Sequence, residues 1–447
     1  MRQWMCPWTK CIGAWCCAAA LLAADTPAQA PPVTLTLSQA VDLALKNNLQ
    51  ALLAEERVTE ARGEKAVALS ALLPNLSGVA YESNLTSNLT AMGLSAEIFP
   101  GIPAFIGPFN RFDARVQFSQ TVFSLASIRR YQAGNRAVTL AGHHRQLAAQ
   151  QIAAATSLAY LAVLESGESV AAAQANLELA RRLLDLAKSR REEGVATGID
   201  VARAETRLAN QQVQLAQTQT NLDSARLGLL RIVGAPLSCQ LALTQEMRFS
   251  PQPPPDRALA VDQALAGRVE LKAARESLRI AELQRKAAVA DWAPSASFFG
   301  DYGSSGLKVN AVNLPTRSIG VRLDVPLFNG GRTRAETQIA SSRQRQAEMQ
   351  LNDLRAAVEK DVRQALDNLA TREEQVKAAQ KAVALAEREL ELAQDRFRNG
   401  VADNIEVVNA QTAVENARQA LVSSVAQFNV ARLSLAVASG HAEDFRL

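Results

Sequence analysis

This chain of 447 residues is poor in the side chains that usually carry catalysis or bind metal, with only three histidines and five cysteines. His143 and His144 are adjacent, so they point to different sides of a helix and do not form a metal-binding pair. The sequence has no glycine-rich phosphate loop, no nucleophile elbow and no metal-spaced cluster of cysteine and histidine. We therefore expect no catalytic residues, no metal site, no cofactor and no enzymatic activity.

Aromatic residues and net charge are also low. Aromatics make up 5% of the chain, and 48 basic residues against 44 acidic residues leave a formal charge of only +4. A charge this small and this dispersed argues against a nucleic-acid partner. The dominant residues are Ala, Leu, Gln, Arg and Glu, a composition that favours long helices.

Proline and glycine are missing from long stretches. No proline occurs between Pro108 and Pro236 or after Pro326, and neither glycine nor proline occurs from Arg332 to Asn399. A helix over this last stretch would be on the order of 100 Å long, at 1.5 Å per residue. Globular domains rarely contain such a helix, so the pattern predicts a coiled coil.

The first 30 residues predict a secretory signal peptide. Basic Arg2 and Lys10 precede an apolar run over 11–24, and Ala28-Gln29-Ala30 forms a small-x-small cleavage site. An uncleaved membrane anchor is the alternative, but the apolar run is short for a membrane span. Cleavage would remove four cysteines and leave only Cys239, which excludes an intramolecular disulfide.

Lipidation is a second alternative for the N-terminus, because Cys16 and Cys17 follow the apolar start. Bulky Trp15 stands before Cys16, however, where a lipoprotein signal needs a small residue. After the signal we expect no apolar run long enough for a membrane helix. The exported chain is then either soluble or crosses a membrane as strands.

The chain repeats itself. "EEGVATGIDVARAE" (192–205) matches "RNGVADNIEVVNAQ" (398–411), and three further stretches align without gaps: 41–74 on 261–294, 116–123 on 321–328, and 158–234 on 364–440. The sequence therefore predicts two copies of one unit of roughly 200 residues. The first unit covers 31–249 and the second 258–440, with a proline-rich linker over 250–257 and a tail over 441–447.

Each unit is predicted as a helix, two strands, a long helix, a tip and a final helix, with tips at about 194–200 and 400–406. Apolar residues recur every seven positions along the helices, as in Val407, Val414, Leu421, Phe428 and Leu435. Sustained seven-residue spacing predicts left-handed supercoiling. An ordinary helix-bundle core is the alternative, although it predicts such spacing over fewer heptads.

The predicted strands lie at about 75–86, 115–122, 295–303 and 317–328. Alternation gives one polar face, with Arg322 and Asp324, and one apolar row: Val116, Phe118, Val122, Ile319, Val321, Leu323 and Val325. Such a pattern is typical of a half-buried sheet or of a transmembrane barrel wall, in which the apolar row faces lipid and Arg322 and Asp324 face the lumen.

Four strands cannot close a barrel, and lipid cannot satisfy an open sheet edge. Subunits would have to pool their strands, with eight from two chains or twelve from three. The alternation does not choose between these numbers.

With these features in order, the sequence resembles the outer-membrane efflux protein family, the TolC-like channels of Gram-negative bacteria. The resemblance covers about residues 35–440. It rests on "LSQAVDLALKNN" (37–48), "LFNGGR" (327–332), the two "GV" tips with "ID" (199–200) and "IE" (405–406), and the two-unit layout.

The resemblance implies a mainly α fold with a β-barrel portion, assembled as a homotrimer. Twelve strands would form a barrel in the outer membrane, and coiled-coil hairpins would form a tunnel through the periplasm. It further implies a periplasmic adaptor and an inner-membrane transporter as partners, in an efflux or type I secretion system. The transported substrate cannot be inferred from the sequence.

At the tip, the resemblance assigns Gly194 and Gly400 to the turns and places Glu406, with Asp200 as its counterpart, near the tunnel mouth. Ala402 and Phe397 depart from the family's pattern, which has a basic residue and a tyrosine there. Asp200 and Glu406 could instead be solvated charges at helix starts, stabilised by the helix dipole. For the whole chain, the competing function is a periplasmic coiled-coil adaptor or scaffold without a membrane barrel.

Overall fold

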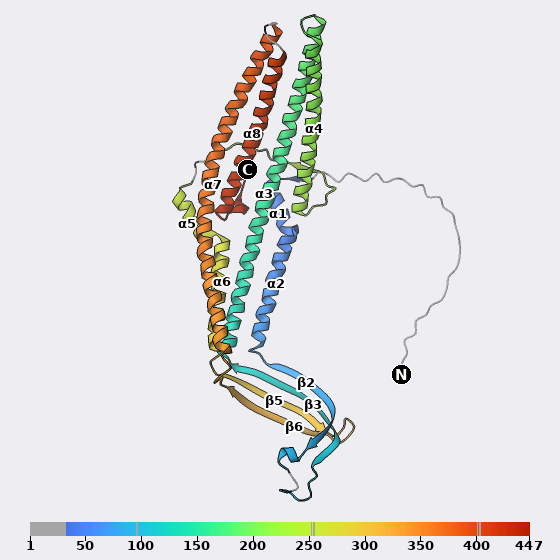
Figure 1. Ribbon diagram of the computed structural model, residues 1–447, viewed down its shortest axis with the longest axis vertical. Helices are drawn as coiled ribbons and strands as arrows, with labels where there is room; N and C mark the ends of the chain where they lie inside the picture. Colours follow the sequence, from blue (N-terminus) through green and yellow to red (C-terminus); the bar gives the residue numbers. More distant parts are fainter. Residues whose placement is uncertain (1–32, 95–96, 252, 254, 400, 402–403) are drawn as a thin grey trace, which may run out of the picture.

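The computed structural model describes residues 33–94, 97–251, 253, 255–399, 401 and 404–447. The signal peptide predicted over 1–30 and the tip residues Gly400 and Ala402 lie outside these residues. Figure 1 shows an elongated molecule with a four-stranded sheet at one end and the tips of two helical hairpins at the other.

The same order of elements occurs twice. The first set is α1 (Leu37–Asn47), α2 (Leu49–Ser70), β2 (Asn75–Asn88), β3 (Phe105–Phe123), α3 (Leu125–Glu192) and α4 (Gly198–Val233). The second set is α5 (Arg257–Gly267), α6 (Val269–Ala290), β5 (Ser295–Gly306), β6 (Leu314–Asp324), α7 (Arg332–Arg398) and α8 (Asn404–Ala438). Shorter elements are β1 (Val33–Leu35), β4 (Leu241–Leu243) and the 3₁₀ turns η1 (Thr90–Met92) and η2 (Ala442–Asp444).

The helix that opens each set is interrupted, where the sequence pattern predicted a single helix. Asn48 ends α1 and begins α2 with an extended backbone, and its side chain accepts a hydrogen bond from the Gln50 amide at 2.9 Å. Asparagine favours such a position because its side chain competes with helical backbone bonds. The Asn48 amide also donates to the Ile232 carbonyl at 3.0 Å, which fixes the break against the end of α4.

The long helices α3 and α7 contain 68 and 67 residues, and each turns back into a shorter helix to form a hairpin (Figure 1). The predicted heptad positions Val407, Val414 and Phe428 are buried in α8. Each hairpin has its own small core at the same aligned positions. In the first it consists of Leu184, Ala187, Val201 and Ala204, and in the second it includes Leu390, Ala393, Val407 and Ala410.

Among the residues that the structure describes, two helical segments, Leu125–Glu192 and Ile405–Ala438, are long and apolar enough to cross a membrane by length and composition alone. The expectation that no such run follows the signal was therefore wrong. The reason lies in coiled-coil packing, because alanine and leucine fill the contacts between helices. In α3, for example, Ile152, Ala153 and Leu161 are buried in the core at the base of the first hairpin.

The sheet is antiparallel in the order β2-β3-β5-β6. The pairing of β3 with β5 at the centre of the sheet therefore joins the two halves of the chain. Within this sheet, β2 and β6 are the edges. The sequence expectation for the last strand was too long, because β6 ends at Asp324 and Val325 lies beyond it. Pro326 explains this end, since proline cannot donate a ladder hydrogen bond.

Candidate functional site

The first hairpin tip forms a glycine-terminated helix end. Gly194 has a φ of 76°, a left-handed conformation that glycine adopts without steric cost. The Val195 amide donates to the Arg190 carbonyl at 2.9 Å, and the Gly194 amide donates to the Arg191 carbonyl at 3.0 Å. These bonds satisfy carbonyls that the end of α3 would otherwise leave unpaired.

One of these hydrogen bonds recurs at the second tip, where the Val401 amide, aligned with that of Val195, donates to the Arg396 carbonyl at 3.0 Å. The turn residue predicted there, Gly400, lies outside the described residues. Val195, Ile199, Val401 and Ile405 are exposed, so both tips present apolar side chains.

The two acidic residues predicted at the tips lie in different settings. Asp200 lies in the first turn of α4, and its Oδ2 accepts hydrogen bonds from the Thr197 amide at 2.8 Å and the Thr197 hydroxyl at 2.6 Å. Glu406 lies in the first turn of α8, and its Oε1 is 3.1 Å from Nη1 of Arg396. Each carboxylate is therefore near a helix start, where the dipole favours negative charge, and each is also held by its own hairpin.

Arg190 crosses from the first hairpin to the second, a contact that the sequence did not suggest. Its guanidinium donates to the Phe397 carbonyl at 3.0 Å and to the Arg398 carbonyl at 2.9 Å, both at the C-terminal end of α7. It also lies 5.6 Å from the centre of the Phe397 ring. The end of a helix carries partial negative charge, so a cation there is stabilised by the dipole, by the hydrogen bonds and by the ring.

A second connection between the hairpins lies farther from the tips. Arg207 of α4 forms an ion pair with Glu415 of α8, and both side chains are largely buried. The Gln211 amide donates to the same carboxylate at 3.1 Å. Next to it, a groove of about 500 Å³ runs between the first turns of α4 and α8, with Ile199, Arg203, Arg207 and Ile405 among its lining.

At the other end of the molecule, strand register sorts the sheet into two faces. Phe118 lies opposite Gly300, which lies opposite Ile319, while Val321 lies opposite Phe298. Val116, Phe118, Ile319, Val321 and Leu323 therefore share one face, as predicted, and Phe118 and Phe298 meet edge to face at 5.7 Å. Val122 lies at a bulge between Thr121 and Phe123, so it has no register partner in β5.

The opposite face carries charge. Arg322 and Asp324 lie on it, as predicted, but its centre is a cluster that the sequence reading missed: Arg115 forms ion pairs with Asp113 and, at 3.0 Å, with Asp301. Asp113 and Arg115 are two apart in one strand, a spacing that places them on one face and could have drawn attention to them. Arg322 packs 5.3 Å from the Phe299 ring, and that ring occupies the space a side chain at Gly320 would need.

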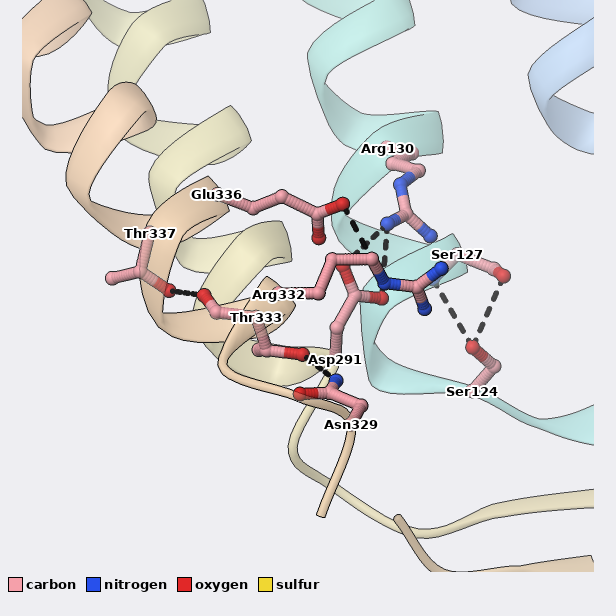
Figure 2. Close-up of polar contacts among 9 residues, drawn as sticks. All are labelled: Ser124, Ser127, Arg130, Asp291, Asn329, Arg332, Thr333, Glu336 and Thr337. Atoms are coloured by element: carbon pink, nitrogen blue, oxygen red, sulfur yellow. Dashed lines mark hydrogen bonds and ion pairs between the residues drawn. The ribbon is translucent and has the colours of Figure 1, made fainter.

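Polar contacts hold the helix ends that lie next to the sheet, as Figure 2 shows. Ser124 caps the start of α3 by accepting from the Ser127 amide at 3.2 Å. Arg130 donates two hydrogen bonds to Asp291, at 2.6 and 2.9 Å, which ties α3 to the end of α6. At the start of α7, Asn329 donates to the Thr333 hydroxyl and Arg332 lies 3.8 Å from Glu336.

Within the described part of the chain, no group of three or more His, Cys, Asp or Glu side chains could hold a metal ion. Two features stand out in the described residues: a two-faced sheet with open edges at one end, and a pair of tips linked by Arg190 at the other.

Comparison with known proteins supports this architecture. A family model described as "Outer membrane efflux protein" matches residues 40–235 and 260–441. The alkaline protease secretion protein AprF of Pseudomonas aeruginosa is 25% identical over 392 residues, which cover 87% of this chain and 80% of AprF. The outer membrane protein TolC of Escherichia coli is 24% identical over 345 residues, which cover 74% of this chain and 70% of TolC.

The fold also matches a solved channel. The CmeC outer membrane channel of Campylobacter jejuni superposes with a TM-score of 0.79 at 18% identity, over 92% of this chain and 87% of CmeC. The chain therefore belongs to the outer membrane efflux protein family: it is an outer-membrane protein that extends into the periplasm and serves as the exit duct of an efflux or secretion system.

Proposed function

We propose that three copies of this chain form the duct, with twelve strands in one barrel. The sheet of a single chain leaves β2 and β6 as open edges, and lipid cannot satisfy their backbone groups. Pairing β6 of one copy with β2 of the next closes the sheet. An eight-stranded barrel has an interior that side chains fill, so two copies leave little room for transport, whereas a larger barrel leaves a channel.

The observation that carries this proposal is a difference in burial between aligned positions. Val67 of α2 is 72% exposed, whereas its counterpart Ala287 of α6 is 2% exposed. Likewise Leu53 of α2 is 40% exposed and Ala273 of α6 is 5% exposed. Helix α6 packs against both α3 and α7, so the apolar face of α2 lacks the second neighbour that α6 has, and another copy of the chain supplies it.

The two-unit division belongs to the same proposal. Units 31–249 and 258–440, joined by a linker at 250–257, place two hairpins in each copy and six around a threefold axis. The repeated element order and the two segments matched by the family model support this division. Residues 1–30 act as a signal peptide that directs export.

In the membrane, the shared apolar face with Val116, Phe118, Ile319, Val321 and Leu323 contacts lipid. The face with Arg115, Arg322 and Asp324 lines the lumen. Val122, at the bulge, and Val325, after the strand, lie at the helical end of the sheet, where the barrel meets the tunnel.

At the tips, the exposed apolar residues support docking of a periplasmic adaptor that brings an inner-membrane transporter. Glu406, with Asp200 contributing, gives the tunnel mouth a field that favours cations. Relatives are named for secretion of alkaline protease and for export of pyoverdine, so both a protein and a small molecule fit this class of duct. Gene deletion with a secretion assay and a broad susceptibility screen separates these two classes of substrate.

Native mass spectrometry in mild detergent tests the assembly directly, and we expect mainly trimer. The trimer, reconstituted into planar bilayers, should conduct ions, which a periplasmic adaptor or scaffold would not do. A protein that remains monomeric in mild detergent, or that stays soluble without detergent, contradicts the shared barrel and favours the adaptor.

A further inference from the structure

We propose that Arg396 is an intersubunit clasp, which binds the C-terminal end of α3 in the next copy of the chain. The inference rests on the ring proposed above and names the residues that close the tunnel between subunits. In the first hairpin, an arginine near the tip binds the helix end of the second hairpin. The aligned arginine of the second hairpin makes no such contact within the described part of the chain.

The contact inside the chain is the pattern for the one between copies. Arg190 of the first hairpin reaches two carbonyls at the end of α7, Phe397 and Arg398, at 3.0 and 2.9 Å. In the alignment of 158–234 on 364–440, Arg190 matches Arg396. Both are arginines four residues before the turn glycine, so both side chains leave their helices at the same place relative to the tip.

The apolar faces beside the two arginines differ in the same way, because one is covered within the chain and the other is not. Leu179, Leu183 and Leu186 of α3 pack on the core of the second hairpin. Two of their counterparts, Leu385 and Leu392 of α7, are 72% and 50% exposed. A face that is covered in the first hairpin is thus bare in the second, and the first hairpin of another copy has the matching core to cover it.

The acceptors on that neighbouring copy follow from the alignment. Phe397 and Arg398 match Arg191 and Glu192, so Arg396 would donate to the carbonyls of Arg191 and Glu192 in the next copy. The aromatic ring is absent there, but Glu192 and the adjacent Glu193 add negative charge to the negative end of the helix dipole. Arg190 and Arg191 lie in the same last turn, so what the neighbour offers Arg396 is the negative end of a helix dipole with two carboxylates beside it.

Forming this clasp changes the partner of Arg396. In the single chain, Arg396 lies 3.1 Å from Glu406, and both side chains are about half exposed. An exposed ion pair of this kind is weak, typically worth about 0–1 kcal/mol, so exchanging it for the helix end of the next copy is not opposed strongly. Glu406 is then released toward the mouth of the tunnel.

The two hairpins of one chain are also joined by a buried ion pair, and the proposed contact between copies has no equivalent of it. Arg207 and Glu415 pair across the two hairpins of one chain, but their aligned counterparts are Ala413 and Ala209. Three of the six seams around the ring would therefore contain a buried ion pair, and the other three would not. Arg396 becomes the main polar fastening of those three, and the tip separates first between subunits.

Site-directed cross-linking tests the contact. In a Cys239→Ser background, one tagged chain carries Arg396→Cys and a second, differently tagged chain carries Glu192→Cys; the two are co-expressed and treated with a short bismaleimide. We expect a product that carries both tags. The matched control co-expresses chains with Arg190→Cys and Arg398→Cys, whose contact lies within one chain, and should give no doubly tagged product.

The arginine itself is tested by thermal dissociation of the trimer on native gels. Arg396→Ala should lower the dissociation temperature, while Arg388→Ala, an exposed arginine of α7 paired with Glu391, should not. If the trimer is intact but gives no doubly tagged product, or if the two alanine variants lower the dissociation temperature equally, the clasp is wrong. The trimeric ring itself would still stand. A protein that native mass spectrometry finds only as monomer overturns the ring and the clasp together.

Discussion

Arg268 fastens three helices at the point where α5 ends and α6 begins. Its largely buried guanidinium lies 2.8 Å from Glu270 and 3.5 Å from Asp361 of α7. Burial alone would raise the pKa of Glu270, but the hydrogen bond and charge of Arg268 outweigh it and lower that pKa below its ordinary value of 4.5. This ion pair holds the helical break in place, as the Asn48 side chain does in the first unit.

The lowered pKa of Glu270 predicts a loss of stability in acid. A carboxylate with a depressed folded-state pKa contributes stability above its unfolded pKa, and that contribution disappears as pH falls through the folded pKa. Glu270→Gln should lower stability at neutral pH by about 1–3 kcal/mol, because it leaves a buried charge with one partner fewer. The variant should also show a shallower loss of melting temperature between neutral pH and pH 3.

Circular dichroism melts at a series of pH values provide the measurement. Glu391→Gln, which removes an exposed partner of Arg388, serves as the control and should change the melting temperature little at any pH. A wild type and a Glu270→Gln variant with parallel pH profiles would show that the ion pair does not couple folding to protonation.

Some site residues could be found from the sequence and others could not. Gly194 and Glu406 stand out because an interrupted helical pattern occurs twice at aligned positions. Arg190 looks like any other arginine in a long polar helix, since its partners are backbone carbonyls some two hundred residues away, which have no sequence signature. The identity of Arg190 with Arg396 at aligned positions was the one signal available.

At the scale of elements, the sheet has two faces with different environments. The register places Val321 and Leu323 on the apolar face and Arg322, between them, on the charged face. Val321→Arg and Leu323→Arg should reduce assembly in the outer membrane, because a charge on the lipid face costs about 2–4 kcal/mol at mid-bilayer and less toward the interface, which Leu323 approaches. Arg322→Gln should assemble normally. Fractionation followed by a heat-modifiability gel measures the assembled fraction, and equal yields for all three variants would contradict the lipid assignment.

Alternation predicted β6 and the second half of β3, where one face is apolar over several residues, but it is weaker in β2 and β5, and residues 105–114 of β3 were missed. It failed where a local rule decides the structure. Pro326 stops the ladder, so β6 ends at Asp324 and Val325 is left outside it. Strands β1 and β4 contain only three residues each, too few to show a period. The breaks at Asn48 and Arg268 were missed because the apolar pattern continues through both positions, and only the backbone changes direction.

At the scale of the whole molecule, duplication within one chain would give the proposed trimer a ring of six similar hairpins. The two hairpins have diverged where they meet each other, as Arg207 and Glu415 show, but they retain the tip turn and an acidic residue after it. Such hairpins would give a duct in which the contacts within a chain are stronger than those between copies. All the tips around the mouth would still carry the same turn and an acidic residue.

The ring predicts how charge at the mouth affects conduction. Three copies of Glu406, released by Arg396, would surround one axis, and rings of carboxylates favour cations in pores. In planar bilayers, Glu406→Gln and the double variant Asp200→Asn/Glu406→Gln should show reduced cation preference at low salt. The difference from wild type should vanish near 1 M salt, because the Debye length falls from about 10 Å at 0.1 M to about 3 Å at 1 M.

Asp200→Asn keeps an acceptor for Thr197, so α4 should still form. Reversal potentials that match wild type at every salt concentration would place the selectivity of the duct elsewhere and leave these carboxylates as charges that stabilise helix starts.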